Sequence, residues 1–170
     1  PKYTSDFVEL IGWFLTDGSY YEAARAKTAD RPVATLCQSQ TGNAEKVARI
    51  DALIDRLNIK TWRSVNKNGI VIWSLDASTS AALHETFPKR ILTPEFLQTL
   101  TTDQAHVLLG AMLAGDGTID SAGKTSFVTA SEESAGLFQI LCTMAGSASA
   151  LHVRDMSKYT PMSPKMNAVR

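Results

Sequence analysis

Two segments of this chain share one pattern, and the repetition limits the possible folds more than any other feature. "LIGWFLTDG" ends at Gly18, and "LLGAMLAGDG" ends at Gly117. Each segment is an almost wholly apolar run, which predicts a helix buried on more than one side. Each run stops at an Asp-Gly pair, containing Asp17 in the first copy and Asp116 in the second. A repeat of this kind indicates an internally duplicated chain.

The residues after the first motif predict a complete helix-strand-strand-helix-strand-strand-helix unit. The turn "TADRP", the capping cluster "TGN" and the hairpin turn "NKNG" separate its elements. The expected helices are 5–16, a second that follows Asn43 and ends at Asn58, and 78–87; the expected strands are 19–27, 33–38, 60–65 and 70–75.

After a linker, "PKRILTPEFLQTL", the same order starts again but is not completed. The second apolar helix is expected to run from 101–103 to Asp116, with strand residues to Val128, a helix over 131–144 and a strand over 150–155. The remaining segment is too short for a closing strand and helix. We therefore predict an α+β fold with two αββαββα halves and pseudo-twofold symmetry, the second half incomplete. The expected domains are 1–90, a linker over 91–101, and 102–170.

Small side chains recur on both apolar helices at a spacing of four. Such spacing lets two helix backbones approach closely, which favours parallel packing of the two helices. The expected pairs are Gly12 with Thr16, Gly110 with Ala114 and Ala111 with Gly115. In that arrangement the two terminal carboxylates meet at one end of the helix pair.

It is electrostatically unfavourable to bring two carboxylates together at the C-terminal ends of two helices. The C-terminus of a helix disfavours an anion, and two neighbouring carboxylates repel each other. A divalent cation reverses both effects, and Mg²⁺ binds through one or two carboxylates with waters and phosphates. Asp17 and Asp116 are therefore candidate metal ligands of a metal-assisted hydrolase. The alternative is that each Asp is a solvated helix-end residue with the following Gly as a C-terminal cap.

The overall charge does not favour a nucleic-acid binder, but its distribution does. The formal net charge is +0, whereas nucleic-acid-binding domains usually are basic. Segment 59–75 nevertheless carries three basic residues and no acid, and 153–170 is also mostly basic. Cys37 and Cys142 are expected to be core thiols of an intracellular protein rather than a disulfide. No apolar run is long enough to span a membrane.

These motifs resemble the dodecapeptide motif of LAGLIDADG homing endonucleases, in the single-chain class with two motifs. The linker and the order of elements are similar to those of intein-associated members, and the resemblance covers about 4–155. It implies a monomer whose two motif helices form the interface between the halves. It also implies hydrolysis of both strands of a double-stranded DNA site with magnesium.

The resemblance also implies roles for particular residues. Two or more Mg²⁺ ions are expected at Asp17 and Asp116 and at the backbone of Thr16 and Gly115, with Mn²⁺ or Ca²⁺ able to substitute in binding. Gln40 and Lys89 match a Gln and a basic residue that family members place near metal-bound waters. Ser131 is the expected counterpart of Gln40, so the two active sites are expected to be unequal.

Strands of the two sheets are expected to contact the DNA major groove, because a two-stranded ribbon fits that groove. The candidate DNA-contacting residues are Tyr21, Arg25, Lys27, Gln38, Lys60, Trp62, Arg63, Lys67, Arg90, Arg154 and Lys158. Two other functions stay open at this point. One is a maturase-like or decayed module that binds nucleic acid without cutting it, and the other is a purely structural protein.

Overall fold

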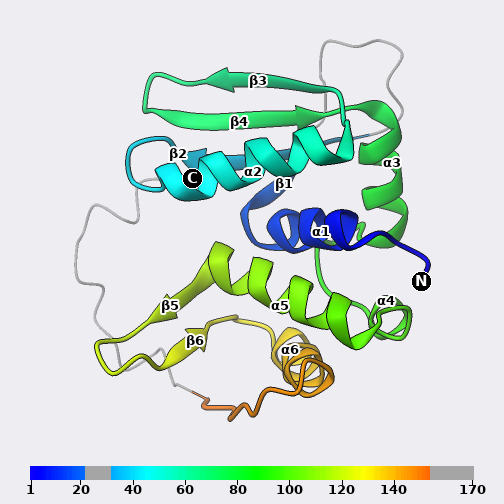
Figure 1. Cartoon of the computed structure of the whole chain (residues 1–170), viewed down its shortest axis with the longest axis vertical. Coiled ribbons are helices and arrows are strands. Elements are labelled where there is room, and N and C mark those ends of the chain that lie inside the picture. Colours follow the sequence, from blue (N-terminus) through cyan, green and yellow to red (C-terminus); the bar gives the residue numbers. More distant parts are fainter. Residues whose placement is uncertain (22–31, 154–170) are drawn as a thin grey trace.

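The computed structural model describes residues 1–21 and 32–153, which form a mixed α+β fold with two antiparallel sheets. The helices in this part of the chain are α1 (Ser5–Asp17), α2 (Ala44–Leu57), α3 (Ala77–Thr86), α4 (Pro94–Leu97), α5 (Thr102–Asp116) and α6 (Glu132–Met144). The strands are β1 (Gly18–Tyr21), β2 (Val33–Ser39), β3 (Thr61–Val65), β4 (Ile70–Leu75), β5 (Gly117–Ile119) and β6 (Thr125–Phe127). Figure 1 shows α1 and α5 side by side between the two sheets.

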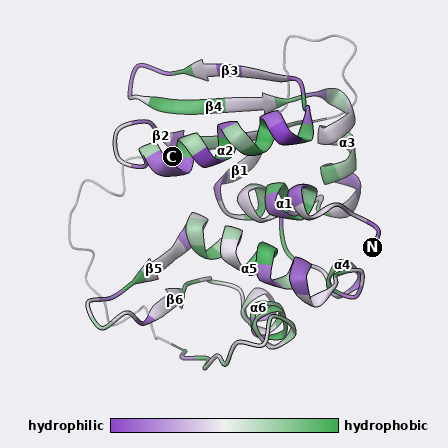
Figure 2. Cartoon of the chain, in the orientation of Figure 1, coloured by the Kyte–Doolittle hydropathy of each residue, from purple (hydrophilic) through white to green (hydrophobic). Residues whose placement is uncertain are grey.

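The first half has the predicted order of elements. Its strands form an antiparallel sheet in the order β1-β2-β4-β3, and the "NKNG" turn joins β3 to β4 as expected. Helix α2 buries Val47, Ile50, Leu53 and Ile54 and exposes hydrophilic residues on its other side (Figure 2). The expected first strand continued to Lys27, but residues 22–31 lie outside the described part of the chain.

Both motif helices begin at a threonine cap and lead directly into a strand. The Thr4 hydroxyl accepts a hydrogen bond from the Phe7 backbone, and Thr101 forms a reciprocal capping box with Gln104. Gly18 has φ −93° and Gly117 has φ −73°, so both are extended. Each glycine is nevertheless the C-cap residue, as the alternative to a metal site expected, with its backbone N–H donating to the carbonyl of Phe14 or Leu113, but neither has the left-handed conformation usual for a glycine cap.

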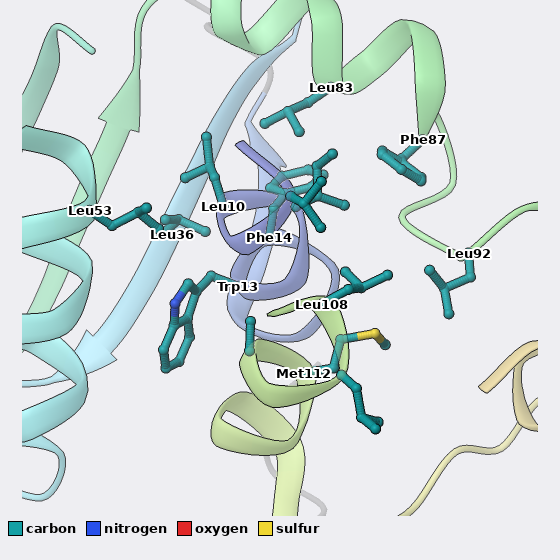
Figure 3. Close-up of a cluster of buried hydrophobic side chains, with 14 of the residues drawn as sticks. Leu10, Trp13, Phe14, Leu36, Leu53, Leu83, Phe87, Leu92, Leu108 and Met112 are labelled. Carbon is teal, nitrogen blue, oxygen red and sulfur yellow. The ribbon is translucent and has the colours of Figure 1, made fainter. Parts of the chain in front are cut away.

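The core of the first half lies around α1. Figure 3 shows Leu10 and Phe14 of α1 next to Leu83 and Phe87, with Leu108 and Met112 of α5 on the other side. The side chains of Leu10, Phe14 and Leu108 are fully buried. Because α1 contacts β1 and β2 of the sheet, α2 and α5 at once, it is apolar nearly all round. This packing fixes the position of the residue that ends α1.

The two motif helices pack in parallel, and their backbones touch at small residues. A Cβ built on Gly12 would lie 2.5 Å from the Ala111 Cβ and 3.3 Å from the Leu108 carbonyl oxygen. A Cβ on Gly115 would lie 2.6 Å from the Thr16 Cβ. The predicted close packing is thus present, but the expected contribution of Gly110 is wrong. No atom lies within 4 Å of a Cβ built on Gly110, which faces away from α1.

The second half repeats the order helix, strand, strand, helix. Its two strands pair over Gly117–Ile119 and Thr125–Phe127, and Phe127 stacks on Phe138 of α6 at 4.2 Å between ring centroids. The strand expected over 150–155 is not formed at 150–153, and 154–155 lie outside the described residues. Within the described ranges, no helix is long and apolar enough to cross a membrane. Cys37 and Cys142 are free thiols.

Candidate metal and nucleic-acid site

Asp17 and Asp116 lie at the adjacent ends of α1 and α5. A Cβ built on Gly115 would be 3.1 Å from the Asp17 Oδ2, so the first carboxylate lies directly over the last turn of α5. Asp17 is half-buried and Asp116 is exposed. The close packing at Gly12, Thr16 and Gly115 therefore brings together the two acids that the repeat singled out.

The environment of Asp17 disfavours its charged form. Burial raises the pKa of this carboxyl above its ordinary value, and the negative charge of Asp116 raises it further. Lys46, a hydrogen bond from Gln38 and Arg90 act in the opposite direction, but the pKa remains raised. The nearby cations and the Gln38 hydrogen bond thus offset only part of the unfavourable effect of burial and of Asp116 on the charged form of Asp17.

One oxygen of Asp17 is held by a chain of two side-chain amides. The Gln38 Nε2 donates to the Asp17 Oδ2 at 2.6 Å, and the Asn43 Nδ2 donates to the Gln38 Oε1 at 2.9 Å. Gln38 is only 4% exposed. Asn43 occupies the N-cap position of α2 but makes no side-chain cap hydrogen bond there. Its amide instead fixes the orientation of the Gln38 amide, and within 1–21 and 32–153 no hydrogen bond engages the Asp17 Oδ1.

The structure places Gln38, not Gln40, beside Asp17. Gln40 follows β2 in a turn, where its backbone N–H donates to the Gly69 carbonyl and its side chain is exposed. The end of β2 accounts for the difference: Gln38 lies within the strand and points to the face that α1 covers, whereas Gln40 comes after Ser39, where the strand has ended. Gln38 was expected as a DNA contact, and its position beneath the helices does not provide one.

Register also identifies the counterpart of Gln38 in the second half. Gly18 pairs with Leu36 and Gly117 pairs with Phe127, so two residues farther along, Thr129 corresponds to Gln38. Ser131, the expected counterpart, is the N-cap of α6, and its hydroxyl accepts from the Ser134 backbone. The two halves are therefore unequal, although not through the residue pair that the sequence suggested.

Two basic side chains reach the backbone ends of the motif helices, and both come from the first half. The Arg90 Nη2 donates to the carbonyls of Leu15 and Thr16 at 3.4 and 3.3 Å. The Lys46 Nζ donates to the Gly115 carbonyl at 2.9 Å. Arg90 was expected to contact DNA, but its guanidinium lies against the C-terminus of α1.

Lys89, the expected catalytic lysine, is exposed and directly precedes Arg90 in the sequence. No side-chain contact joins it to Asp17 in the described part of the structure. Sequence reasoning also missed Lys46 and Asn43. Lys46 could have been noticed in the sequence, because a lysine in the first turn of a helix interacts unfavourably with the helix dipole. No feature of the sequence indicated a role for Asn43, because asparagine is a usual N-cap residue.

The donor set fits a hard divalent ion. Two carboxylates supply oxygen ligands, which Mg²⁺, Mn²⁺ and Ca²⁺ prefer. The Thr16 and Gly115 carbonyls, the other expected ligands, already accept hydrogen bonds from Arg90 and Lys46. The described residues contain no cluster of three or more His, Cys, Asp or Glu side chains that could hold an ion. That leaves a site completed by waters and phosphates, as Mg²⁺ favours, rather than a closed protein cage.

We predict that Asp17→Asn stabilises the metal-free protein at neutral pH. The folded pKa of Asp17 is raised, so folding binds its proton more tightly than the unfolded chain does. The stabilising contribution is therefore complete below the ordinary value of 3.8 and is lost as the pH rises through the folded pKa. Asparagine still accepts from Gln38 and has no charge to lose. Thermal melts in EDTA from pH 3 to pH 8, in ~1-unit steps, should show an advantage of the variant only above that transition.

The other face of the first sheet is exposed at its two edge strands, and the described parts of its strands carry no charged side chain there. Cross-strand pairing places Ser19, Thr35, Ser74 and Trp62 in one row across all four strands. The Trp62 side chain is 76% exposed, and Tyr21, on the same face, is 61% exposed. Two of the expected DNA-contacting residues therefore lie on a free surface of hydroxyl and aromatic groups.

Arg63 lies on the opposite face, where a carboxylate pairs with it. It is in register with the buried Trp73, and both side chains donate to Asp51 of α2. The distances are 3.0 Å from the Arg63 Nε and 2.7 Å from the Trp73 Nε1. The expectation that Arg63 is an uncompensated DNA contact is therefore wrong. Lys60 and Lys67 flank β3 and are exposed.

Four further candidates for DNA contact lie outside the described residues. They are Arg25, Lys27, Arg154 and Lys158. Their roles stay predictions.

Comparison with known proteins identifies the fold. No family model and no curated protein matches this sequence. A structure of mesophilic variants of the homing endonuclease I-DmoI matches with a TM-score of 0.65 and 12% identity, over 91% of this chain and 84% of that one. An I-DmoI variant in complex with its target DNA and manganese gives 0.66 and 11%, over 90% and 82%.

A third match is the N-terminal LAGLIDADG domain of DUF199/WhiA, with a TM-score of 0.51 and 13% identity over 91% of this chain and 74% of that one. All three share the LAGLIDADG architecture, and the identities are low enough that the likeness concerns the fold alone. This protein therefore has the fold of the LAGLIDADG homing endonucleases, with Asp17 and Asp116 at the paired ends of its central helices.

Proposed function

We propose that this protein is a site-specific DNA endonuclease that depends on divalent metal ions. The observation that carries the proposal is the meeting of Asp17 with the last turn of α5, which ends at Asp116. A fold has little reason to hold two acids at the negative ends of two helices unless a cation joins them. The neighbours with this fold include I-DmoI in complexes with target DNA and manganese, calcium or magnesium.

The residues of the first half would act in the following way. A bound divalent ion neutralises charge on a phosphodiester and makes a bound water more acidic. Asp17 offers its Oδ1 to such an ion while Gln38 holds the other oxygen. Asn43 keeps the Gln38 amide in one orientation, so that its N–H group faces the site. A fixed donor near the reacting water contributes to rate through positioning.

The open face of the first sheet is the proposed DNA surface. An antiparallel ribbon fits the major groove, where Ser and Thr hydroxyls contact several bases and apolar groups contact the thymine methyl. In the row of Ser19, Thr35, Ser74 and Trp62, Ser74 and Trp62 are suited to that kind of contact, whereas Thr35 is buried and its hydroxyl is hydrogen-bonded to Ser19. Since the row has no charge, phosphate contacts would come from residues at its margins, such as Lys60 and Lys67.

Two observations favour a second candidate, a DNA-binding module that does not cut. Asp116 is exposed and has no side-chain hydrogen bond in the described part of the protein. The second sheet has only β5 and β6 in the same part. Selection of binding sites from a randomised double-stranded library in Ca²⁺, followed by transfer of the selected site to a plasmid with Mg²⁺, separates the candidates. Linear or nicked product supports the endonuclease, whereas a bound but intact plasmid supports the module.

We predict that the two strands are cut at unequal rates. Asp17 has the Gln38–Asn43 chain, whereas the position equivalent to Gln38 in the second half is Thr129. A nicked plasmid should therefore accumulate before the linear form. Gln38→Ala should slow one strand by about 10- to 100-fold, the usual cost of losing an outer-sphere partner. Gln40→Ala is the matched control and should cut both strands like wild type. Equal strand rates in wild type would contradict the assigned asymmetry.

A further inference from the structure

Lys46 occupies a position that is unfavourable for a cation within its own helix. It is the third residue of α2, in the first turn, where the helix dipole favours acids. Its Nζ nevertheless reaches a carbonyl 69 residues away in sequence, at Gly115 in the other half. The reason for a lysine at this position therefore lies in α5 and not in α2.

The end of α5 combines several sources of negative potential. The Gly115 carbonyl belongs to the last turn, where helix carbonyls lack partners within the helix. Asp116 follows Gly115, and the Asp17 Oδ2 would lie 3.1 Å from a Cβ built on Gly115. Lys46 lowers the pKa of Asp17, while Asp116 raises it. The ammonium is thus placed where all three features attract a cation.

The second half, as far as residue 153, supplies no equivalent cation. The first turn of α6 carries Glu132 and Glu133, and the residue after them, at the position of Lys46, is Ser134. The Ser134 backbone N–H donates to the Ser131 hydroxyl. Arg90, the other cation at a motif-helix end, donates to carbonyls of α1. Among the described residues, Lys46 is therefore the side-chain cation that serves the end of α5.

We propose that Lys46 acts as an internal cation that joins the acidic ends of α1 and α5 until a divalent ion takes over that role. The ammonium stabilises the metal-free arrangement, and it competes with the ion for the Gly115 carbonyl and for the field of the two carboxylates. Lys46 is a positioning residue in this account, because it acts through α5 and the acids. The inference rests on the divalent-ion site of the proposed function.

The first test measures the metal-free protein. In EDTA, Lys46→Met should lower the melting temperature by about 2–4 °C, the shift expected for a loss of about 1 kcal/mol in a chain of about this length. Lys46→Arg retains the charge and should melt like wild type. Lys60→Met removes an exposed lysine and is the matched control. Equal melting temperatures for Lys46→Met and Lys60→Met would overturn the joining role.

The second test measures binding of Mn²⁺ alone, without DNA, by calorimetry or by electron paramagnetic resonance. Removing one positive charge about 6 Å from a divalent ion in a water-like dielectric should tighten binding about tenfold. Lys46→Gln should show this gain with a smaller loss of stability, because its amide still donates to a carbonyl. Lys46→Gln can therefore be used for the binding measurement if Lys46→Met does not fold.

The outcomes separate this inference from the proposed function. Tighter Mn²⁺ binding by Lys46→Gln, with unchanged binding by Lys60→Met, supports the internal cation. Unchanged or weaker binding by Lys46→Gln overturns it while leaving the metal site intact. If the wild-type protein binds no Mn²⁺, the metal site of the proposed function is overturned. The competition between Lys46 and a divalent ion is then overturned as well. A lower metal-free melting temperature of Lys46→Met would then still support the joining role.

Discussion

Gly12→Ala is expected to lower the free energy of unfolding by about 1–3 kcal/mol, the usual cost of overpacking a tight contact. The new Cβ would lie 2.5 Å from the Ala111 Cβ and 3.3 Å from the Leu108 carbonyl oxygen, so the helices must separate. Backbone atoms of α5 cannot give way as a flexible side chain does. Urea denaturation followed by circular dichroism measures the difference.

Gly110→Ala is the matched control, because it makes the same change on the partner helix. No atom lies within 4 Å of the added Cβ, and alanine is the better helix former by about 0.5–1 kcal/mol. This variant should therefore be more stable than wild type. Two substitutions of one type in two neighbouring helices should thus have opposite signs. Stabilisation by both would show that α1 and α5 are not in contact at Gly12.

A further consequence of Gly12→Ala concerns the site. Because Asp17 and Asp116 are carried by the ends of these helices, a shift at the contact changes the spacing of the acids. Any cleavage activity of Gly12→Ala should therefore fall by more than the decrease in the folded fraction explains. Comparing activity well below the melting temperature of each variant separates the two effects.

Asp17→Asn and Asp116→Asn are each expected to reduce DNA cleavage by more than about 100-fold, the upper range for residues that only support a metal ligand. Asparagine keeps the shape of the side chain and an oxygen acceptor, but it removes the charge that attracts a divalent ion. Binding of the selected DNA should remain close to that of wild type, because neither residue lies on the open face of the sheet. A plasmid time course and a gel-shift titration measure the two properties.

Asp103→Asn is the control for this pair. It removes an exposed acid from the first turn of α5, at the end of the helix opposite Asp116. This variant should cut at the wild-type rate. Undiminished cleavage by Asp17→Asn or Asp116→Asn would exclude the assigned metal role. Loss of DNA binding together with cleavage would instead place the acids in the DNA interface.

The periodicity of the sequence was sufficient to predict the elements and the importance of two residues. Apolar helices that stop at Asp17 and Asp116 signalled a duplication, and the α+β order of the first half followed from local turn and cap signals. These predictions succeeded because helix and strand periods and turn chemistry are local properties. The predicted strand at 150–155 failed where no partner strand is available to pair with it in the described residues.

Tertiary packing decided which side chains surround those two acids. The end of β2 at Ser39 placed Gln38 beside Asp17 and left Gln40 in an exposed turn. The pairing of β3 with β4 directed Arg63 to Asp51. The packing of α1 on α5 places Gly12 of α1 at the point of closest approach, whereas Gly110 of α5 faces away from it. Lys46 meets Gly115 only because the two halves pack together. The sequence by itself determined the two carboxylates and the helices that carry them, whereas their partners depend on long-range contacts that no local pattern encodes.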